Sequence, residues 1–243
     1  MSSLRNDVPD DVDLGRVWVS VAARVWRREP GWLERTASRL LRSPGLARAL
    51  LTTPSLLLPW LLASVAVLAA GAAATTESGQ PLVALLAPAV AAAAIAYSYG
   101  PGVDPAWELS CSMAVSDRMV LLVRALAVFA VNAVLGLAAS VASVVSVSGP
   151  GGGTAAAVTF GWLIPMTAVC AFALAVATVA RSASAGAAAG VGAWLITVLC
   201  GQAASGHFSA AVSDTVLFLP YLAIGVGCAA VAVYATRIPR GTL

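Results

Sequence analysis

Residues 104–117 carry the side chains that are best suited to recognise another protein. Two carboxylates, those of Asp104 and Glu108, flank the large apolar side chain of Trp107. A short helix that combines acidic and apolar groups matches a groove on a soluble protein. The side chains expected to make this contact are Asp104, Trp107, Glu108, Leu109, Met113, Val115, Ser116 and Arg118. The chemistry that they indicate is docking, with no bond made or broken.

The local sequence predicts a helix over about 104–117. Asp104 is a suitable N-cap, because its carboxylate can accept the free amide hydrogens of the first turn. Pro105 then falls at the first helical position, where a missing N–H costs nothing, and Glu108 suits the positive end of the helix dipole. An ordinary interfacial loop helix, without a docking role, is the alternative interpretation of the same pattern.

No catalytic constellation accompanies these residues. The sequence contains no GxxxxGK[ST] phosphate loop, no HExxH and no GxSxG motif. The four cysteines are scattered without a CxxC pair, and three fall in apolar segments where a thiol acts as a small hydrophobe. His207, the single histidine, lies in a short loop and is more typical of an inert residue than of a ligand. We therefore expect neither an enzyme nor a metal or cofactor site on this chain.

The composition indicates an integral membrane protein. The chain is 60% hydrophobic and 10% charged, whereas soluble domains carry about 25% charged residues. All fourteen basic residues are Arg, which together with the Ala and Val excess is typical of a high-GC genome. The net charge of +3 lies almost wholly outside the apolar segments and does not indicate nucleic-acid binding.

Six apolar segments are each long enough to be a transmembrane helix, which needs roughly 20 residues. The predicted fold class is therefore all-α, with six spans that form a transmembrane domain over 52–243. The expected spans cover about 55–74, 82–99, 119–147, 154–180, 183–204 and 215–236.

The region before the first span, 1–51, is predicted to be cytoplasmic and to contain amphipathic helix. One helix is expected over about 12–28, and a second piece over 32–51 repeats its mixture of Leu and Arg. Such basic amphipathic helices lie in the headgroup plane of a membrane, and docking onto a soluble partner is the alternative. The apolar stripe of the first helix consists of Leu14, Val17, Trp18, Val21 and Val25.

The distribution of arginines predicts the orientation. With a cytoplasmic N-terminus, six spans return the C-terminus to the cytoplasm, and every arginine then lies on that side. The loops 75–81, 148–153 and 205–214 on the other side carry only Glu77 and Asp214 as charges. This bias is what the positive-inside rule expects for a multi-pass protein of the plasma (inner) membrane.

The predicted spans contain no acidic residue, so an intramembrane carboxylate for proton or sodium coupling is missing from them. Their polar side chains are hydroxyls and the amides of Asn132 and Gln202. We interpret Asn132 as an interhelical hydrogen-bonding residue rather than a substrate contact. Gly186 and Gly190, spaced as GxxxG, are expected to let helices approach closely in the fifth span.

The segment between the second and third spans resembles that of ABC-2 (type V) exporter permeases. The matching residues are Glu108-Leu109, Ala114-Val115-Ser116 and Leu121-Leu122-x-Arg124. An amphipathic helix leading into the first span is a second likeness. Residues 111–113, Cys-Ser-Met, depart from the Leu-rich sequence of many relatives.

The resemblance implies that transport and ATP hydrolysis are carried out by different chains. Residues 104–117 would be the coupling helix that docks into a cytosolic ABC ATPase, and that partner would hold ATP and magnesium. A second copy of the permease, or a sister permease, would complete the path through the lipid bilayer. A hydrophobic or amphipathic cargo would suit spans without fixed charge. The alternative is a non-transporting membrane scaffold or sensor that recruits a cytosolic regulator.

Overall fold

The computed structural model describes residues 13, 15–17, 31–41, 54–78, 80–99, 117–147, 161–206, 208, 210–213 and 217–236. These residues are helical or lie in short turns, and no strand occurs among them. The chain divides into two compact units, Met1–Arg48 and Ala49–Leu243.

The first unit contains α2 (Trp32–Leu41). Trp32, Arg35 and Arg39 are exposed on it and recur at helical spacing along one face. Near residue 15, the Asp13 carboxylate accepts a hydrogen bond from the amide of Arg16 (3.1 Å), as an N-cap does. Within the predicted apolar stripe, Val17 is described and is exposed. The other stripe residues, Leu14, Trp18, Val21 and Val25, and the remainder of the second piece, 42–51, lie outside the described residues.

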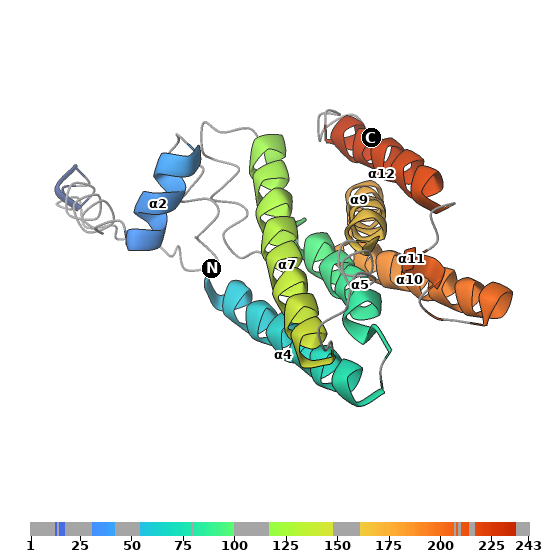
Figure 1. Cartoon of the computed structure of the whole chain (residues 1–243). Coiled ribbons are helices and arrows are strands. Elements are labelled where there is room, and N and C mark those ends of the chain that lie inside the picture. The colour runs from blue at the N-terminus through green and yellow to red at the C-terminus, as the bar shows by residue number, and fades with distance from the viewer. Residues whose placement is uncertain are drawn as a thin grey trace, which may run out of the picture. The chain divides into compact units, whose positions relative to one another are not determined.

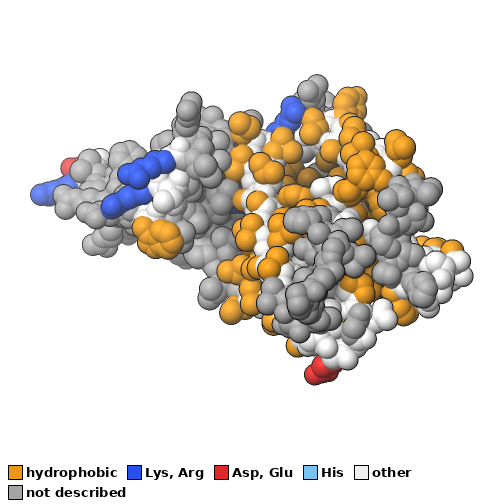
Figure 2. Space-filling view, viewed as in Figure 1, with side chains coloured by type: hydrophobic (Ala, Val, Ile, Leu, Met, Phe, Trp, Pro, Cys, Tyr) orange, Lys and Arg blue, Asp and Glu red, His pale blue; other side chains and the backbone are white. Residues whose placement is uncertain are grey.

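The second unit is built from the helices α4 (Pro54–Ser78), α5 (Leu82–Tyr97), α7 (Asp117–Val147), α9 (Leu163–Ala180), α10 (Ala183–Ser205) and α12 (Phe218–Ala235), with the short α11 (Ala210–Ser213) (Figure 1). Each long helix falls on one of the predicted spans. All but α5 contain a stretch that is long and apolar enough to cross a membrane, which makes five such helices among the described residues. Apolar side chains cover much of the described surface (Figure 2).

Two helix ends differ from the expected bounds for local reasons. The α4 helix runs on to Ser78, and hydroxyl groups in its last turns donate back to carbonyls of the preceding turn, as from Thr75 to Gly71 (2.7 Å). Glu77 therefore lies in the last turn of α4 and not in the loop that was predicted to begin at residue 75. The α5 helix stops at Tyr97, where both the amide (3.1 Å) and the hydroxyl (2.6 Å) of Ser98 donate to the carbonyl of Ile95.

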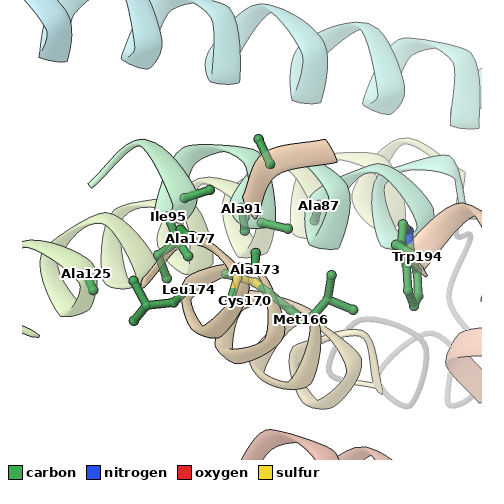
Figure 3. Packing of buried hydrophobic residues seen from close by; sticks show 14 of the residues in the cluster. Ala87, Ala91, Ile95, Ala125, Met166, Cys170, Ala173, Leu174, Ala177 and Trp194 are labelled. Atoms are coloured by element: carbon green, nitrogen blue, oxygen red, sulfur yellow. The ribbon is translucent and has the colours of Figure 1, made fainter. Parts of the chain in front are cut away.

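The α5 helix lies at the centre of the second unit. It packs against α4, α7, α9 and α10, whereas α12 packs mainly against α9. Figure 3 shows Ala87, Ala91 and Ile95 of α5 facing the α9 side chains, which include Cys170 and Ala173. Most of these side chains are small, so the helix backbones approach closely and dispersion contacts accumulate along the interface.

The close approach of α10 depends on Gly186 and Gly190. A Cβ atom on Gly186 would lie 2.6 Å from the carbonyl oxygen of Ala173. On Gly190 it would lie 2.7 Å from Cβ of Ala173 and 3.1 Å from Cβ of Ala92, so three helices meet at this point. The two glycines therefore occupy the crossing of α10 with α9 and α5. Gly192, on another face of α10, has no described residue within 4 Å of such an atom.

A hydrogen bond between helices ties α10 to α5. The indole N–H of Trp194 donates to the carbonyl of Leu85 at 2.7 Å, and the Trp194 side chain is 1% exposed. Pro88, three residues further along α5, has no amide hydrogen for the carbonyl of Ala84. The Trp194 bond thus reaches the carbonyl next to the one that Pro88 leaves without its helical donor.

Replacing Trp194 by Phe is expected to lower the free energy of unfolding by about 1–2 kcal/mol, because the interhelical bond and part of the buried ring are lost. Denaturant unfolding of the purified protein in detergent would measure the change. Trp60→Phe is the matched control, since the indole nitrogen of Trp60 has no hydrogen-bond partner among the described residues. Equal losses in the two variants would contradict a role for the Trp194 bond.

Candidate functional site

The predicted docking residues fall almost entirely in a stretch that the structure does not describe. Only Arg118 belongs to the described residues, in the first turn of α7, where it is partly exposed. The other predicted docking residues, Asp104, Trp107, Glu108, Leu109, Met113, Val115 and Ser116, lie outside them. The structure does describe the helix ends to which this stretch is joined.

Both of these helix ends are anchored in one hydrophobic core. On the α5 side, Tyr99 is 9% exposed and belongs to the same buried cluster as Leu121 and Ala125 of α7. Val120, in the first turn of α7, is buried as well. By contrast, Tyr97 and Met119 expose about half of their surface, 51% and 49%. At the ends of α5 and α7, buried side chains thus pack together, while Tyr97 and Met119 remain exposed beside them.

A displacement applied to residues 100–116 would therefore move packed helices rather than loose chain. The α5 and α7 helices contact each other, and both also contact α4. Through α5, the movement would reach α9 and α10 as well. Close-packed interiors transmit strain because few voids can absorb it.

Among the described residues, the hydrogen bond of Asn132 lies within its own helix. Its amide nitrogen donates to the carbonyl of Val128 in its own helix at 2.8 Å. A helical side chain leans toward the preceding turn, which brings that carbonyl within reach. The amide oxygen is buried and has no partner among the described residues, although the side chain is only 2% exposed. The bond described for Asn132 thus lies within α7, and its interhelical role stays a prediction.

Trp162, just before α9, is a buried polar residue that the sequence analysis missed. Its ring packs on α7, with Cη2 2.5 Å from the position that a Cβ atom would take on Gly136. Its indole nitrogen is buried and has no partner among the described residues. An unsatisfied buried group of this kind costs roughly 1–3 kcal/mol. The sequence showed only a Trp beside Gly161 within an expected span. It did not indicate that the Trp162 ring would pack on Gly136.

Polar and small residues form one face of α7. Asn132, Gly136, Ser140 and Ser143 recur at helical spacing and are all buried. The hydroxyl of Ser143 donates to the carbonyl of Ser140 at 2.8 Å, so it is satisfied within the helix. The buried face of α7 therefore differs from a purely apolar one. Among the described residues, the amide oxygen of Asn132 on this face and the indole nitrogen of Trp162 against it lack hydrogen-bond partners.

The segment between α10 and α12 packs back onto the bundle. In α11, Ala211 and Val212 are buried, and the carbonyl oxygen of Val212 lies 3.1 Å from the Cβ position of Gly161. The hydroxyl of Tyr221 in α12 donates to the carbonyl of Ala211 at 2.9 Å. The segment expected to be a loop over 205–214 thus holds a short helix next to Trp162, and His207 lies outside the described residues.

Among the described residues, no group of three His, Cys, Asp or Glu side chains is placed to hold a metal ion. Comparisons with protein-family models, curated proteins and solved structures find no match to this chain.

Proposed function

We propose that this chain is the membrane-spanning permease subunit of an ABC-2 type exporter, energised by a separate cytosolic ATPase. The observation that carries the proposal is the central position of α5. This helix leads directly into the segment that resembles the coupling helix, and it packs against α4, α7, α9 and α10. A push delivered to residues 104–117 would therefore reach most of the bundle.

The positions of the charged residues support an external source of energy. In the second unit, the described acidic residues, Glu77 and Asp117, lie in the last turn of α4 and the first turn of α7. Neither is near the middle of a helix, where a carboxylate would serve proton or sodium coupling. ATP hydrolysis on a partner chain is the energy source that remains consistent with this pattern.

The proposal includes an orientation. Arg118 and Arg124 lie in the first turns of α7, and Arg181 lies in the turn between α9 and α10. If each long helix crosses the membrane once, these residues lie on the same side as the arginine-rich N-terminal unit. The positive-inside rule then makes that side cytoplasmic, with the protein in the plasma membrane and both termini inside. A second copy or a sister permease would line the path.

Association with an ATPase tests the proposed function. We expect the purified chain to have no ATPase activity alone, and a tagged chain to co-purify with an ABC ATPase. Hydrolysis by the joint complex in liposomes should exceed that of the ATPase alone. A membrane protein without a transport role would neither retain an ABC ATPase nor stimulate hydrolysis. That result would favour the scaffold or sensor alternative.

A further inference from the structure

We propose that α5 has a hinge at Pro88 and that Trp194 of α10 is the latch that holds this hinge closed. Pro88 lies near the middle of α5, and its side chain is fully buried. Because proline has no amide hydrogen, the carbonyl of Ala84 loses its helical donor, and the proline ring crowds that carbonyl as well. Sharp bends in helices fall at such positions. The sequence of α5 therefore sets the place at which this helix can bend.

The half of α5 before Pro88 is held by α4. A Cβ atom on Gly71 of α4 would lie 2.9 Å from Cδ1 of Leu86 and 3.8 Å from Cγ2 of Val83. The two α5 side chains thus occupy the space beside this glycine. Contacts as close as these leave the first half of α5 little room to turn against α4.

The half of α5 after Pro88 is joined to the first turns of α7. Ile95 belongs to the same buried cluster as Leu121 and Ala125 of α7, and so does Tyr99 just beyond the helix end. The two halves of α5 are thus attached to different neighbours. A bend at Pro88 would move the second half together with the start of α7, while the first half stays with α4.

Trp194 holds the carbonyl next to the weak point of α5. Its indole N–H donates to the carbonyl oxygen of Leu85 at 2.7 Å, and its side chain is 1% exposed. A carbonyl oxygen has two lone pairs, so Leu85 can accept this bond in addition to one from its own helix. When a helix bends at a proline, the carbonyls of the preceding turn change direction. A bend at Pro88 therefore misaligns the Trp194 bond, and the intact bond opposes the bend.

The latch lies on the face of α10 that already touches α5. Gly190 precedes Trp194 by one turn, so both residues lie on the same face of α10. A Cβ atom on Gly190 would lie 3.1 Å from Cβ of Ala92, one turn after Pro88. The close approach of the two backbones at Gly190 brings the Trp194 ring to the turn of α5 that precedes the proline. Figure 3 shows this ring beyond Ala87 and Ala91 along α5.

The role of the latch in transport rests on the proposed function, because residues 100–116 follow the second half of α5 directly. The latch itself does not depend on an ATPase, so a measurement on the purified permease separates the two proposals. If no ATPase associates but α5 bends once the latch is removed, only the proposed function is wrong. If an ATPase is stimulated but α5 does not bend, only the latch is wrong.

Distances between spin labels, measured by double electron–electron resonance, test the latch. The full chain would be held in lipid nanodiscs with its four cysteines replaced by Ala and with labels at Tyr97→Cys and Val179→Cys. These residues are exposed near the ends of α5 and α9. The part of α5 after Pro88 is about 14 Å long, so a bend of about 20° moves its end by roughly 5 Å. We expect one narrow distance with Trp194 present, and a second distance displaced by roughly 5 Å in Trp194→Phe. An unchanged distribution would overturn the proposal.

A second pair of labels separates a hinge from a general loosening of the fold. Gln80 and Ala204 are exposed beside the first turn of α5 and near the end of α10. Labels at these two positions report on the half of α5 that should stay in place, so their distance should be the same with and without Trp194→Phe. Equal broadening for both pairs of labels would show loss of packing throughout the bundle and would overturn the hinge.

A double variant tests whether the bend depends on the proline. Pro88→Ala restores the amide hydrogen that the carbonyl of Ala84 lacks, so adding it to Trp194→Phe should return the label distance to a single narrow value. Persistence of the second distance would overturn a hinge at Pro88. If Trp194→Phe fails to fold, replacement of Trp194 by benzothienylalanine keeps the two fused rings and removes only the N–H. The same two outcomes then decide the question.

Discussion

Replacing Gly190 by Leu is expected to prevent the normal packing of α10 and to lower the free energy of unfolding by about 3 kcal/mol, at the upper end for overpacked interiors. A Cβ atom alone would lie 2.7 Å from Cβ of Ala173 and 3.1 Å from Cβ of Ala92, on two different helices. Neither alanine has a flexible end that could move aside, so relief requires displacement of a helix backbone. Denaturant unfolding and size-exclusion chromatography in detergent would measure the loss.

Gly192→Leu provides the matched control on the same helix. Because nothing lies within 4 Å of a Cβ atom at that position, the added side chain can extend without displacing a neighbour. Both variants remove one glycine and add the same apolar side chain, so they share the effects of helix propensity and hydrophobicity. A Gly190→Leu protein as stable as Gly192→Leu would show that α10 does not pack against α5 and α9 as described.

Replacing Glu108 by Arg is expected to uncouple ATP hydrolysis from transport and to weaken association with the ATPase at least tenfold. The change reverses a charge in the segment proposed to dock, where like-charge contacts across an interface cost several kcal/mol. It also places a cation near the positive end of the predicted helix. Binding between the purified subunits, and ATP-driven uptake of a hydrophobic dye by inside-out vesicles, would measure the two effects.

Glu77→Arg is the control for this charge reversal. Glu77 is exposed in the last turn of α4. The N-terminal unit instead precedes the first turn of this helix in the sequence. The Glu77→Arg substitution should leave ATPase binding unchanged, although it changes the net charge by the same amount as Glu108→Arg. Full coupling in the Glu108→Arg protein would remove residues 104–117 from the docking role. Equal loss in both variants would indicate a general effect of charge.

The sequence alone predicted the long helices of the second unit, although it predicted a loop where α11 lies. Every long helix of the second unit falls on a predicted span, because apolar length is a local property and backbone groups in lipid must be satisfied within the helix. The ends differed by a few residues where hydroxyl groups bonded to nearby carbonyls, as Thr75 and Ser98 do. The GxxxG spacing of Gly186 and Gly190 also marked a place where helices meet.

The arrangement of those helices was decided only by the tertiary structure. Helices that are apolar on all sides carry no periodic signal for the direction of their neighbours. The sequence therefore could not indicate that α5 lies at the centre, or that Gly190 meets two helices and Gly192 meets none. It also could not reveal that Trp162 packs on α7 at Gly136, because that contact joins residues that are distant in the sequence.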